Sequence, residues 1–392
     1  MDKTNYQMNN KPSYIIEFLL WAPSVYSGLD HLMVEVCRLA KEQGKQVICV
    51  YCDTMQNMPL LEQDIIRAGG KIELVSSNAR QMLRDIRSLY RKYRPEVVDT
   101  HFVHPAKLYT QCLSLCFHAR HFTHVHSLLG NVQQFQKQKG LLRRFAVGVY
   151  YWLQKQCSRR VLCISEAIQT EYCQWGYGSN KKVSVTYVGT PLTPSQHTQQ
   201  HIREELQLPL QKNIIANVSA IEPIKGIDVI IKALSLLKQQ GREVLLVHIG
   251  GLRNGTPAEQ NYAESLRLLA KELQVENQIV WLGKRADVQD ILPLADVYVH
   301  PSLSEGLGSV LMEAAVAGLP LIGTHVGGIP EVIREGQTGR LIPPNDPNAL
   351  AQALTQILDN PTNNLGQQAQ TFVFNRFDQT RCAKHLFSTY YA

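Results

Sequence analysis

Two glutamates, Glu305 and Glu313, stand eight residues apart in the segment of the sequence with the most chemical content. The residue types around them predict a strand that ends at His300, a glycine-containing loop, and a helix that begins near Gly308. Backbone N–H groups at a helix N-terminus attract anions, and an ionised carboxylate accepts hydrogen bonds from hydroxyl groups. The segment therefore predicts a site for an anionic ligand that also carries hydroxyls, such as those of a sugar or a ribose. Without its setting, the same spacing is more typical of a solvated helix face.

Short β-branched runs alternate with longer helical patterns along the chain, an order typical of parallel sheets built from βαβ units. In the first half we expect strands at residues 15–21, 46–52, 72–75, 97–101, 123–126 and 160–165, with helices at 31–43, 60–68, 79–93 and about 141–157. The alternation restarts with strands at 213–219, 244–250, 279–282, 297–300 and 321–323, and with helices at 226–239 and 259–273. The sequence thus predicts an α/β fold with two Rossmann-like parallel sheets. A ligand is expected in the cleft at the carboxyl ends of their strands.

The length of 392 residues is typical of two domains, each able to bury its own core. Residues 191–200 interrupt the alternation with prolines and polar side chains, so we interpret them as a linker. This interpretation gives an N-terminal domain at residues 1–190 and a C-terminal domain at residues 201–372. A final helix at residues 373–392 is expected to return to the N-terminal domain.

Composition and charge exclude several classes of protein. Charged residues at 19% and aromatic residues at 8% are inconsistent with a disordered or fibrous chain, and no apolar run reaches the ~18 residues of a membrane-spanning helix. Glu17 interrupts the apolar run at residues 14–22, which favours a buried strand over a signal peptide. The nine cysteines are scattered without zinc-site spacing, so we expect a reducing cytoplasm and neither a disulfide framework nor a structural metal. The formal charge of +7 divides into +10 for residues 1–190 and −3 for residues 191–392.

The segment around Glu305 and Glu313 resembles the signature of the retaining nucleotide-sugar glycosyltransferases of glycosyltransferase family 4, which have the GT-B fold. The similar residues of the second half are Pro301-Ser302, Ala314, Gly318, Pro320, Gly327-Gly328, Pro330-Glu331 and Gly339, together with Pro223-Ile-Lys225-Gly226, Val247-His-Ile-Gly250-Gly251, Trp281-Leu-Gly283, Asp287 and Asp296. In the first half, the similar residues are Ser27-Gly28, Asp99-Thr-His101, Val125-His126 and Ile164-Ser165-Glu166. The resemblance covers about residues 14–392 and is more specific in the second half.

The resemblance implies a retaining, metal-independent transfer of a sugar from a nucleoside diphosphate donor, without a cofactor. It implies three catalytic residues, Glu305 at the donor sugar or at the positive charge on its anomeric carbon, His126 facing the sugar, and Lys225 at the phosphates. Glu313 is expected to bind the nucleotide ribose. The implied donor site is completed by Gly28, Gly250, Gly306, Leu307 and Gly308, whose backbone N–H groups or close turns would approach the nucleotide and its phosphates.

One departure from the family concerns the second cation of the phosphate site. The family commonly has an arginine five or six residues before the lysine, and Ala220 and Ser219 occupy those positions here. We therefore expect another cation, Arg285 or Lys284, to contact the donor phosphates, or else a weaker phosphate site. Arg285 is the one that we include among the donor-binding residues.

Six histidines gather in the first half and have three explanations. They are His101, His104, His118, His121, His124 and His126. On a strand, His124 and His126 would share one face and could ligate a metal if a third ligand converged. Ordinary core or surface histidines are the more frequent explanation, and contact between His126 and the donor is the third. We expect no metal.

The helix expected near residues 80–94 combines a basic face with an apolar stripe. Arginines stand at positions 80, 84, 87 and 91, beside Leu83, Ile86, Tyr90 and Tyr93. This pattern is typical of a core-packed helix with a solvated charged face, and it also fits a helix that contacts an anionic membrane surface. A second basic zone consists of Lys137, Lys139, Arg143 and Arg144. Nucleic acid is not an expected partner, because no recognisable binding module accompanies the charge.

The sequence as a whole predicts a glycosyltransferase that acts on a saccharide or lipid-linked acceptor, held mainly by the N-terminal domain. We expect a role in cell-surface polysaccharide or glycolipid biosynthesis, in the cytoplasm or peripherally at the inner face of the cytoplasmic membrane. Two alternatives remain, a nucleotide-sugar 2-epimerase of similar fold and a non-catalytic nucleotide-sugar-binding protein. The choice of sugar, base and acceptor depends on loop geometry that residue spacing does not reveal.

Overall fold

The computed structural model describes residues 13–20, 27–55, 58–101, 106–127, 149, 152, 154, 156–179, 181–191, 199–209, 213–360 and 364–392. The described strands of the first half form one parallel sheet in the order β3-β2-β1-β4-β5-β6-β7. These strands are β1 (Ser13–Phe18), β2 (Lys45–Cys52), β3 (Lys71–Val75), β4 (Val97–Thr100), β5 (Arg120–Val125), β6 (Arg160–Cys163) and β7 (Val183–Val185). The helices are α1 (Gly28–Glu42), α2 (Pro59–Arg67), α3 (Ala79–Tyr93), α4 (Ala106–Cys116) and α7 (Glu166–Gln174).

The second half repeats this design with a parallel sheet in the order β10-β9-β8-β11-β12-β13. Its strands are β8 (Asn213–Val218), β9 (Val244–Ile249), β10 (Ile279–Trp281), β11 (Val297–His300), β12 (Leu321–Thr324) and β13 (Gly339–Ile342). The helices are α8 (Gln199–Glu205), α9 (Ile227–Gln239), α10 (Pro257–Glu272), α11 (Val288–Ile291), α12 (Ser309–Val316), α13 (Ile329–Val332), α14 (Pro347–Leu358), α15 (Leu365–Arg376) and α16 (Gln379–Tyr391). Short 3-10 turns lie at Pro223–Lys225, Glu276–Gln278 and Leu292–Leu294. The predicted α/β class with two Rossmann-like sheets is confirmed.

The structure adds elements that the sequence pattern did not predict. Strands β7 and β13 have three and four residues and lie at the outer edges of their sheets, so they are too short to show a clear periodicity. Helices α4 and α7 were also missed. Residues 192–198, which make up most of the predicted linker, and most of the helix predicted at 141–157 lie outside the described residues.

Helices on both faces of each sheet explain why the strands read as continuous apolar runs. In β1, Ile15, Ile16 and Phe18 are fully buried, although their side chains alternate between the two faces of the sheet. Glu17, the residue that interrupts this run in the sequence, is fully buried as well. A buried carboxyl group needs hydrogen-bond partners, and those of Glu17 are described below.

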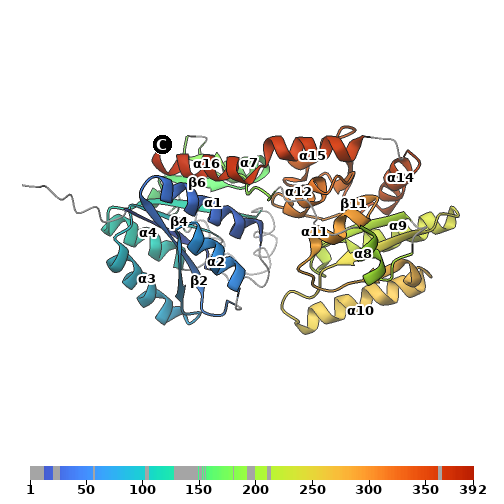
Figure 1. The fold of residues 1–392 in the computed structure, drawn as a ribbon, viewed down its shortest axis with the longest axis horizontal. Helices are drawn as coiled ribbons and strands as arrows, with labels where there is room; N and C mark the ends of the chain where they lie inside the picture. Colours follow the sequence, from blue (N-terminus) through green and yellow to red (C-terminus); the bar gives the residue numbers. More distant parts are fainter. Residues whose placement is uncertain are drawn as a thin grey trace, which may run out of the picture.

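The last two helices lie over different halves of the molecule (Figure 1). Helix α15 packs on α12 in the second half, whereas α16 packs along α1 in the first. Between them, Thr190 and Asp378 form an isolated bridge, so the two chain segments that join the halves lie side by side. The C-terminal helix thereby closes over the core of the first sheet, where Tyr390 is fully buried.

Two expectations about the whole chain can be compared with the structure. No disulfide joins any of the nine cysteines, all of which lie within the described residues. Among the helices of the described part of the chain, none is both long and apolar enough to cross a membrane.

A carboxylate of the second half caps a helix of the first. Glu331 in α13 accepts hydrogen bonds from the backbone N–H groups of Glu166 and Ala167, each at 2.9 Å, at the N-terminus of α7. The Tyr187 hydroxyl donates to the same carboxylate at 2.9 Å. Arg376 in turn donates to Tyr187 Oη at 2.6 Å and to Glu166 at 2.8 Å. Both the negative charge and the acceptor oxygens suit a helix N-terminus, so Glu331 fastens the two halves together.

We predict that Glu331→Ala lowers the free energy of unfolding by about 1–3 kcal/mol, because it leaves two backbone N–H groups without their acceptor and removes one of the two acceptors of the Tyr187 hydroxyl. Thermal and urea denaturation measure this change. The matched control is Glu264→Ala, which removes an exposed glutamate whose described ion pair is an i,i+3 contact with Arg267. Equal stability loss in both variants would show that the interdomain contact contributes nothing specific.

Candidate functional site

Two neighbouring cavities lie where the two halves meet. The larger has a volume of about 400 Å³ and is lined by residues that follow β8, β9 and β10, by Glu313 from α12, and by Gly28 and His31 at the start of α1. The smaller has a volume of about 190 Å³ and is lined by Ser27, Gly28, His126 and residues 305–309. Both lie at carboxyl ends of parallel strands, where open α/β sheets bind ligands.

Glu305 is the centre of a compact group of charged and polar side chains beside the smaller cavity. Its Oε2 atom lies 2.7 Å from Lys225 Nζ and 3.0 Å from His300 Nε2, and Oε1 accepts the N–H of Gly306 at 3.2 Å. Burial by itself raises the pKa of Glu305, but the hydrogen bond from His300 and the charge of Lys225 outweigh burial and hold the pKa well below its ordinary range. Glu305 is therefore ionised at neutral pH.

The loop of Lys225 reaches Glu305 because Gly226 allows two backbones to approach closely. Gly226 has φ +66°, and a Cβ atom there would lie 2.2 Å from the carbonyl oxygen of Pro301. The N–H of Leu303 donates to Ile224 O at 2.8 Å, which joins the same two loops. A side chain at position 226 would separate them. The tight approach places the Lys225 ammonium against the carboxylate of the neighbouring loop.

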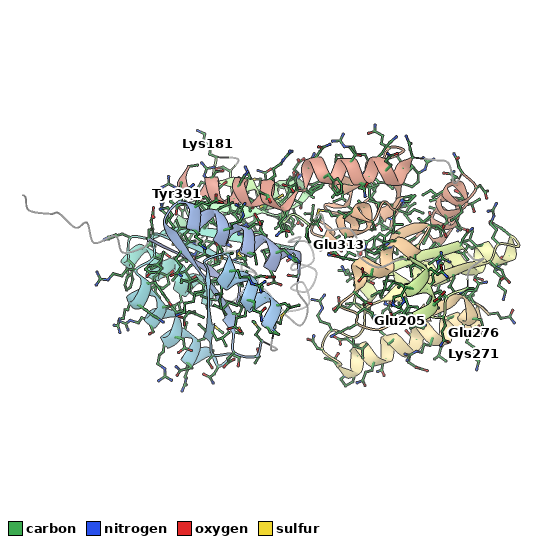
Figure 2. The ribbon with its side chains drawn as sticks, in the orientation of Figure 1. Lys181, Glu205, Lys271, Glu276, Glu313 and Tyr391 are labelled. Carbon is green, nitrogen blue, oxygen red and sulfur yellow. The ribbon has the colours of Figure 1, made fainter. Side chains whose placement is uncertain are left out.

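Glu313 has a different environment from Glu305 although both belong to the same loop–helix segment. It projects from α12 into the larger cavity, on the side of the second half that faces the first (Figure 2). Burial raises the pKa of Glu313 to about 7. The two predicted carboxylates thus line separate cavities. Glu305 is paired with a cation, whereas burial places the pKa of Glu313 close to neutral pH.

The first half contributes Gly28 and His126. Ser27 caps α1 in a capping box with Asp30, and Ser27 and Gly28 at the start of this helix line the smaller cavity. A Cβ atom at Gly306 would lie 2.5 Å from the carbonyl oxygen of His126, so the loops of the two halves touch directly. Gly28, His126, Glu305, Gly306, Leu307 and Gly308 are brought together around the smaller cavity.

Of the two cations considered for the phosphate site, Arg285 is engaged elsewhere. It lines the larger cavity, but its guanidinium donates to Asp287 at 2.8 and 2.6 Å and to Glu205 at 3.2 Å. Lys284 lines the same cavity, and no ion pair of its ammonium occurs within the described part of the chain. Gly250 also lines this cavity, and a Cβ atom there would lie 1.9 Å from Ser219 O, so this position requires glycine.

His300 is a site residue that the sequence reasoning treated only as the end of a strand. Besides Glu305, its Nε2 atom lies 3.1 Å from Ser302 Oγ, and its Nδ1 atom lies 3.2 Å from Tyr298 Oη. The available signal was its place at the carboxyl end of a strand, five residues before the glutamate. Its partners come from the fold of the following loop, which residue spacing does not give.

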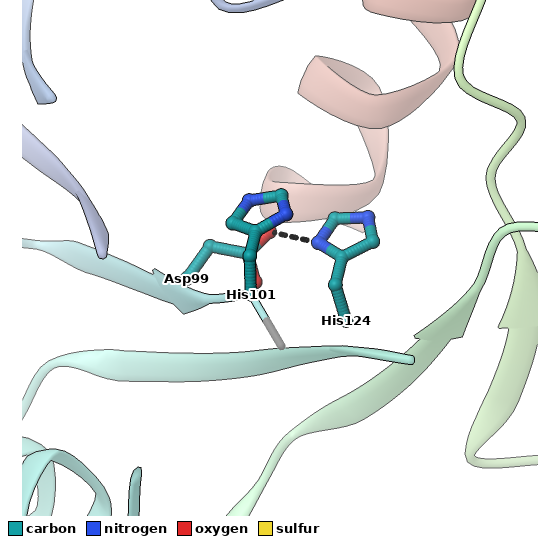
Figure 3. A group of neighbouring side chains, drawn as sticks. All are labelled: Asp99, His101 and His124. Atoms are coloured by element: carbon teal, nitrogen blue, oxygen red, sulfur yellow. Dashed lines mark ion pairs between the residues drawn. The ribbon is translucent and has the colours of Figure 1, made fainter. Parts of the chain in front are cut away.

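The histidine cluster lies in the interior of the first half, in contact with His126. Asp99, His101 and His124 hold potential ligand atoms within 4.8 Å of one another, and all three are buried (Figure 3). Asp99 Oδ2 lies 2.9 Å from His124 Nδ1. The other ring nitrogen of His124 lies 3.0 Å from Thr186 Oγ1, and both ring nitrogens of His101 have protein partners at 3.0 and 3.2 Å. These side chains therefore form a hydrogen-bonded network.

Two family models match most of the chain between them. Residues 198–372 match the family described as Glycosyl transferases group 1, and residues 26–194 match Glycosyltransferase Family 4. Over 163 residues the chain is 36% identical to D-inositol 3-phosphate glycosyltransferase of Corynebacterium glutamicum, covering 40% of this chain and 38% of the relative. It is 28% identical over 193 residues to N-acetyl-alpha-D-glucosaminyl L-malate synthase of Bacillus anthracis, covering 48% of each. The chain thus spans less than half the length of these curated relatives.

Solved structures share the whole architecture. Anabaena HepE in complex with UDP-glucose superposes with a TM-score of 0.78 at 20% identity, covering 96% of this chain and 98% of that one. Sucrose-phosphate synthase from Thermosynechococcus elongatus gives a TM-score of 0.77 at 18% identity, covering 97% and 98%. These similarities confirm the predicted GT-B architecture of two facing Rossmann-like domains.

We predict that the Glu313 carboxyl group lowers the free energy of unfolding by an amount that grows with pH. Burial raises its pKa to about 7 in the folded chain, whereas the unfolded chain has the ordinary value of 4.5, so folding takes up a proton between these pH values and stability falls as pH rises through that window. Glu313→Gln should therefore match the wild type below pH ~4.5 and exceed its unfolding free energy by about 1–3 kcal/mol at pH 8.

Urea denaturation at several pH values between 5 and 8 measures this difference. Glu305→Gln is the control of opposite sign, because it removes an ionised carboxylate that is paired with Lys225 and should lower stability at pH 8. A Glu313→Gln variant whose advantage does not grow with pH would contradict the assignment of a raised pKa.

Proposed function

The chain belongs to the glycosyl transferases group 1 family, and we propose that it is a retaining, metal-independent glycosyltransferase that moves a sugar from a nucleoside diphosphate donor to a saccharide or lipid-linked acceptor. The observation that carries the proposal is Glu305, which lines the smaller cavity and contacts both Lys225 and His300, directly beside a second cavity that is lined by Glu313. One cavity suits the sugar and the phosphates, and the other suits the nucleoside.

Departure of a nucleoside diphosphate requires stabilisation of growing negative charge, which a cation and oriented N–H groups can supply. Lys225 and the N–H groups at the starts of α1 and α12 are the groups that we assign to this task. Glu305, ionised and acceptor-only, is suited to the positive charge that develops at the anomeric carbon. We propose that the acceptor attacks on the face from which the diphosphate departs and gives its proton to the phosphate. No protein nucleophile and no metal is then needed.

The proposed donor is supported by both chemistry and comparison. Glu313 in the larger cavity is a hydrogen-bond acceptor suited to ribose hydroxyls. Anabaena HepE, which has the same architecture, was solved with UDP and with UDP-glucose. Lys284 is the cation that we propose in place of the absent arginine, because Arg285 is held by Asp287 and Glu205.

For the acceptor we propose a saccharide or lipid-linked saccharide bound mainly by the basic first half, with a role in cell-surface polysaccharide or glycolipid biosynthesis. Helix α3 buries Met82, Ile86, Leu89, Tyr90 and Tyr93 against the core, so its apolar side is occupied. Arginines 80, 84, 87 and 91 lie on its exposed face. We propose that this face contacts anionic lipid headgroups at the inner surface of the cytoplasmic membrane.

We predict that Lys225→Ala and Glu305→Ala each reduce kcat about 10²–10³-fold with UDP-, GDP- or ADP-sugar donors and acceptor extracts, because each removes preorganised charge from the transition state. The matched control is Lys232→Ala, which removes a lysine whose described ion pair is within α9 and should leave transfer unchanged. Undiminished transfer in both site variants would refute the assignment. Interconversion of sugars without acceptor would indicate a 2-epimerase, and tight donor binding without turnover would indicate a binding protein.

We predict that the membrane contact depends on the basic face of α3 and on salt. At low ionic strength, liposomes with anionic lipid should retain the wild-type protein, and the triple variant Arg84→Gln/Arg87→Gln/Arg91→Gln should lose most of this retention. A second triple variant, Lys238→Gln/Arg267→Gln/Lys271→Gln, removes the same charge from exposed positions of the second half. Equal retention of the two variants would show that α3 is not the contact surface.

A further inference from the structure

A chain of buried polar side chains connects His126 to the interior of the first half. Its members come from four separate parts of the fold, Glu17 in β1, Asp99 and His101 at the end of β4, His124 in β5, and Tyr390 in α16. All five are at most 2% exposed. Burial of so many polar groups is costly unless each has a partner, so their hydrogen bonds determine which protons they carry.

The contacts form one continuous sequence. His126 Nε2 lies 3.0 Å from His101 Nδ1, and His101 Nε2 lies 3.2 Å from Glu17 Oε2. The Tyr390 hydroxyl lies 2.8 Å from Glu17 Oε1 and 2.7 Å from Asp99 Oδ2. Each of these distances requires a proton between the two atoms, because two lone pairs at such a distance repel.

The protonation state of the inner groups follows from their surroundings. Burial acts to raise the pKa of Asp99, but His124, whose Nδ1 atom lies 2.9 Å from Asp99 Oδ2, outweighs burial and holds the pKa well below its ordinary value, so Asp99 is ionised. Burial and the charge of Asp99 raise the pKa of Glu17, and burial lowers the pKa of His101. Burial lowers the pKa of Lys107 to about 7, and its Nζ atom donates to the backbone oxygen of His124 at 2.9 Å.

Only one arrangement of protons then satisfies every contact. Since Asp99 can only accept, the single proton of Tyr390 points to Asp99, and Tyr390 Oη accepts a proton from Glu17 Oε1. Glu17 Oε2 therefore carries no proton and must accept the N–H at Nε2 of a neutral His101. His101 Nδ1 is then bare and must accept the N–H at Nε2 of His126. Each group, from His126 inward, thus donates a hydrogen bond to the next one, and the series ends at Asp99, which only accepts.

We propose that Glu17 and His101 are positioning residues that hold His126 as the tautomer protonated at Nε2, so that its Nδ1 atom acts only as a hydrogen-bond acceptor. His126 lines the smaller cavity, beside Glu305 and Gly306. On the proposed function, on which this consequence rests, the imidazole accepts from a hydroxyl group and cannot donate to a ring or phosphate oxygen. A bound ligand thus meets two acceptors in this cavity, His126 and the ionised Glu305.

The same cluster has a competing explanation as a metal site. A metal bound by Asp99, His101 and His124 would need a bare ring nitrogen on each histidine and would replace the hydrogen bond that this nitrogen makes in the network. Elemental analysis of the purified protein separates the two explanations directly.

Nitrogen-15 NMR of the full chain with ring-labelled histidine tests the proposal, since long-range couplings report which ring nitrogen carries the proton. The His126 signals are assigned by their loss in His126→Gln. We expect one tautomer, protonated at Nε2, in the wild type without any ligand. A mixture, the other tautomer, or stoichiometric metal in the protein would overturn the proposal.

Two substitutions of Glu17 form a matched pair. In Glu17→Gln, the amide N–H₂ can point to Tyr390 and the amide oxygen can still accept from His101, so the tautomer and transfer within about twofold of wild type should persist. Glu17→Leu removes the acceptor while it keeps the volume, so His126 should become a tautomer mixture and kcat should fall roughly tenfold with KM for the donor less affected. An unchanged His126 tautomer in Glu17→Leu would remove Glu17 from the positioning role.

The NMR result is independent of the proposed reaction, because it is measured without donor or acceptor. If the tautomer is as expected and no transfer occurs, the proposed function fails while the positioning network stands. If transfer occurs with the opposite tautomer, the positioning network fails alone. Circular dichroism and thermal denaturation of Glu17→Leu verify that it folds, and the wild-type spectrum decides the tautomer whether or not that variant folds.

Discussion

The loop between β11 and α12 is held by backbone contacts that are too close for any side chain. Cβ atoms at Gly306, Gly328 and Gly226 would lie 2.5, 2.4 and 2.2 Å from the carbonyl oxygens of His126, Gly306 and Pro301. Because these contacts join the loop to the first half, to α13 and to the lysine loop at once, the two cavities and their charged groups depend on them. Glycine at these positions is a requirement of packing.

The same loop–helix segment carries two carboxylates with opposite electrostatics. Glu305 is paired with Lys225 and His300, and its pKa lies below the ordinary range, whereas burial raises the pKa of Glu313 to about 7. Environments that push two titratable groups apart are typical of sites where the groups have different tasks. Here the ionised carboxylate faces the smaller cavity and the one that titrates near neutrality faces the larger.

Much of the architecture could be predicted because local signals and burial agree. Helix α3 occupies residues 79–93 as expected, since Asn78 caps its start and Pro95 prevents continuation beyond its end. The central strands were found from their apolar runs. The edge strands β7 and β13 were not, because three or four residues show too little periodicity and their assignment depends on the neighbouring strand.

The sequence by itself determined the two-sheet fold class, the resemblance to a glycosyltransferase family, and the identity of Lys225, Glu305 and Glu313 as the residues with chemical content. Only the tertiary structure decided which side chains share a proton or a charge. In the folded chain, Arg285 donates to Asp287 and Glu205, and His101 connects His126 to Glu17. Glu17 and His101 are 84 positions apart, and such contacts arise from strand order and helix packing, which residue spacing along the chain does not encode.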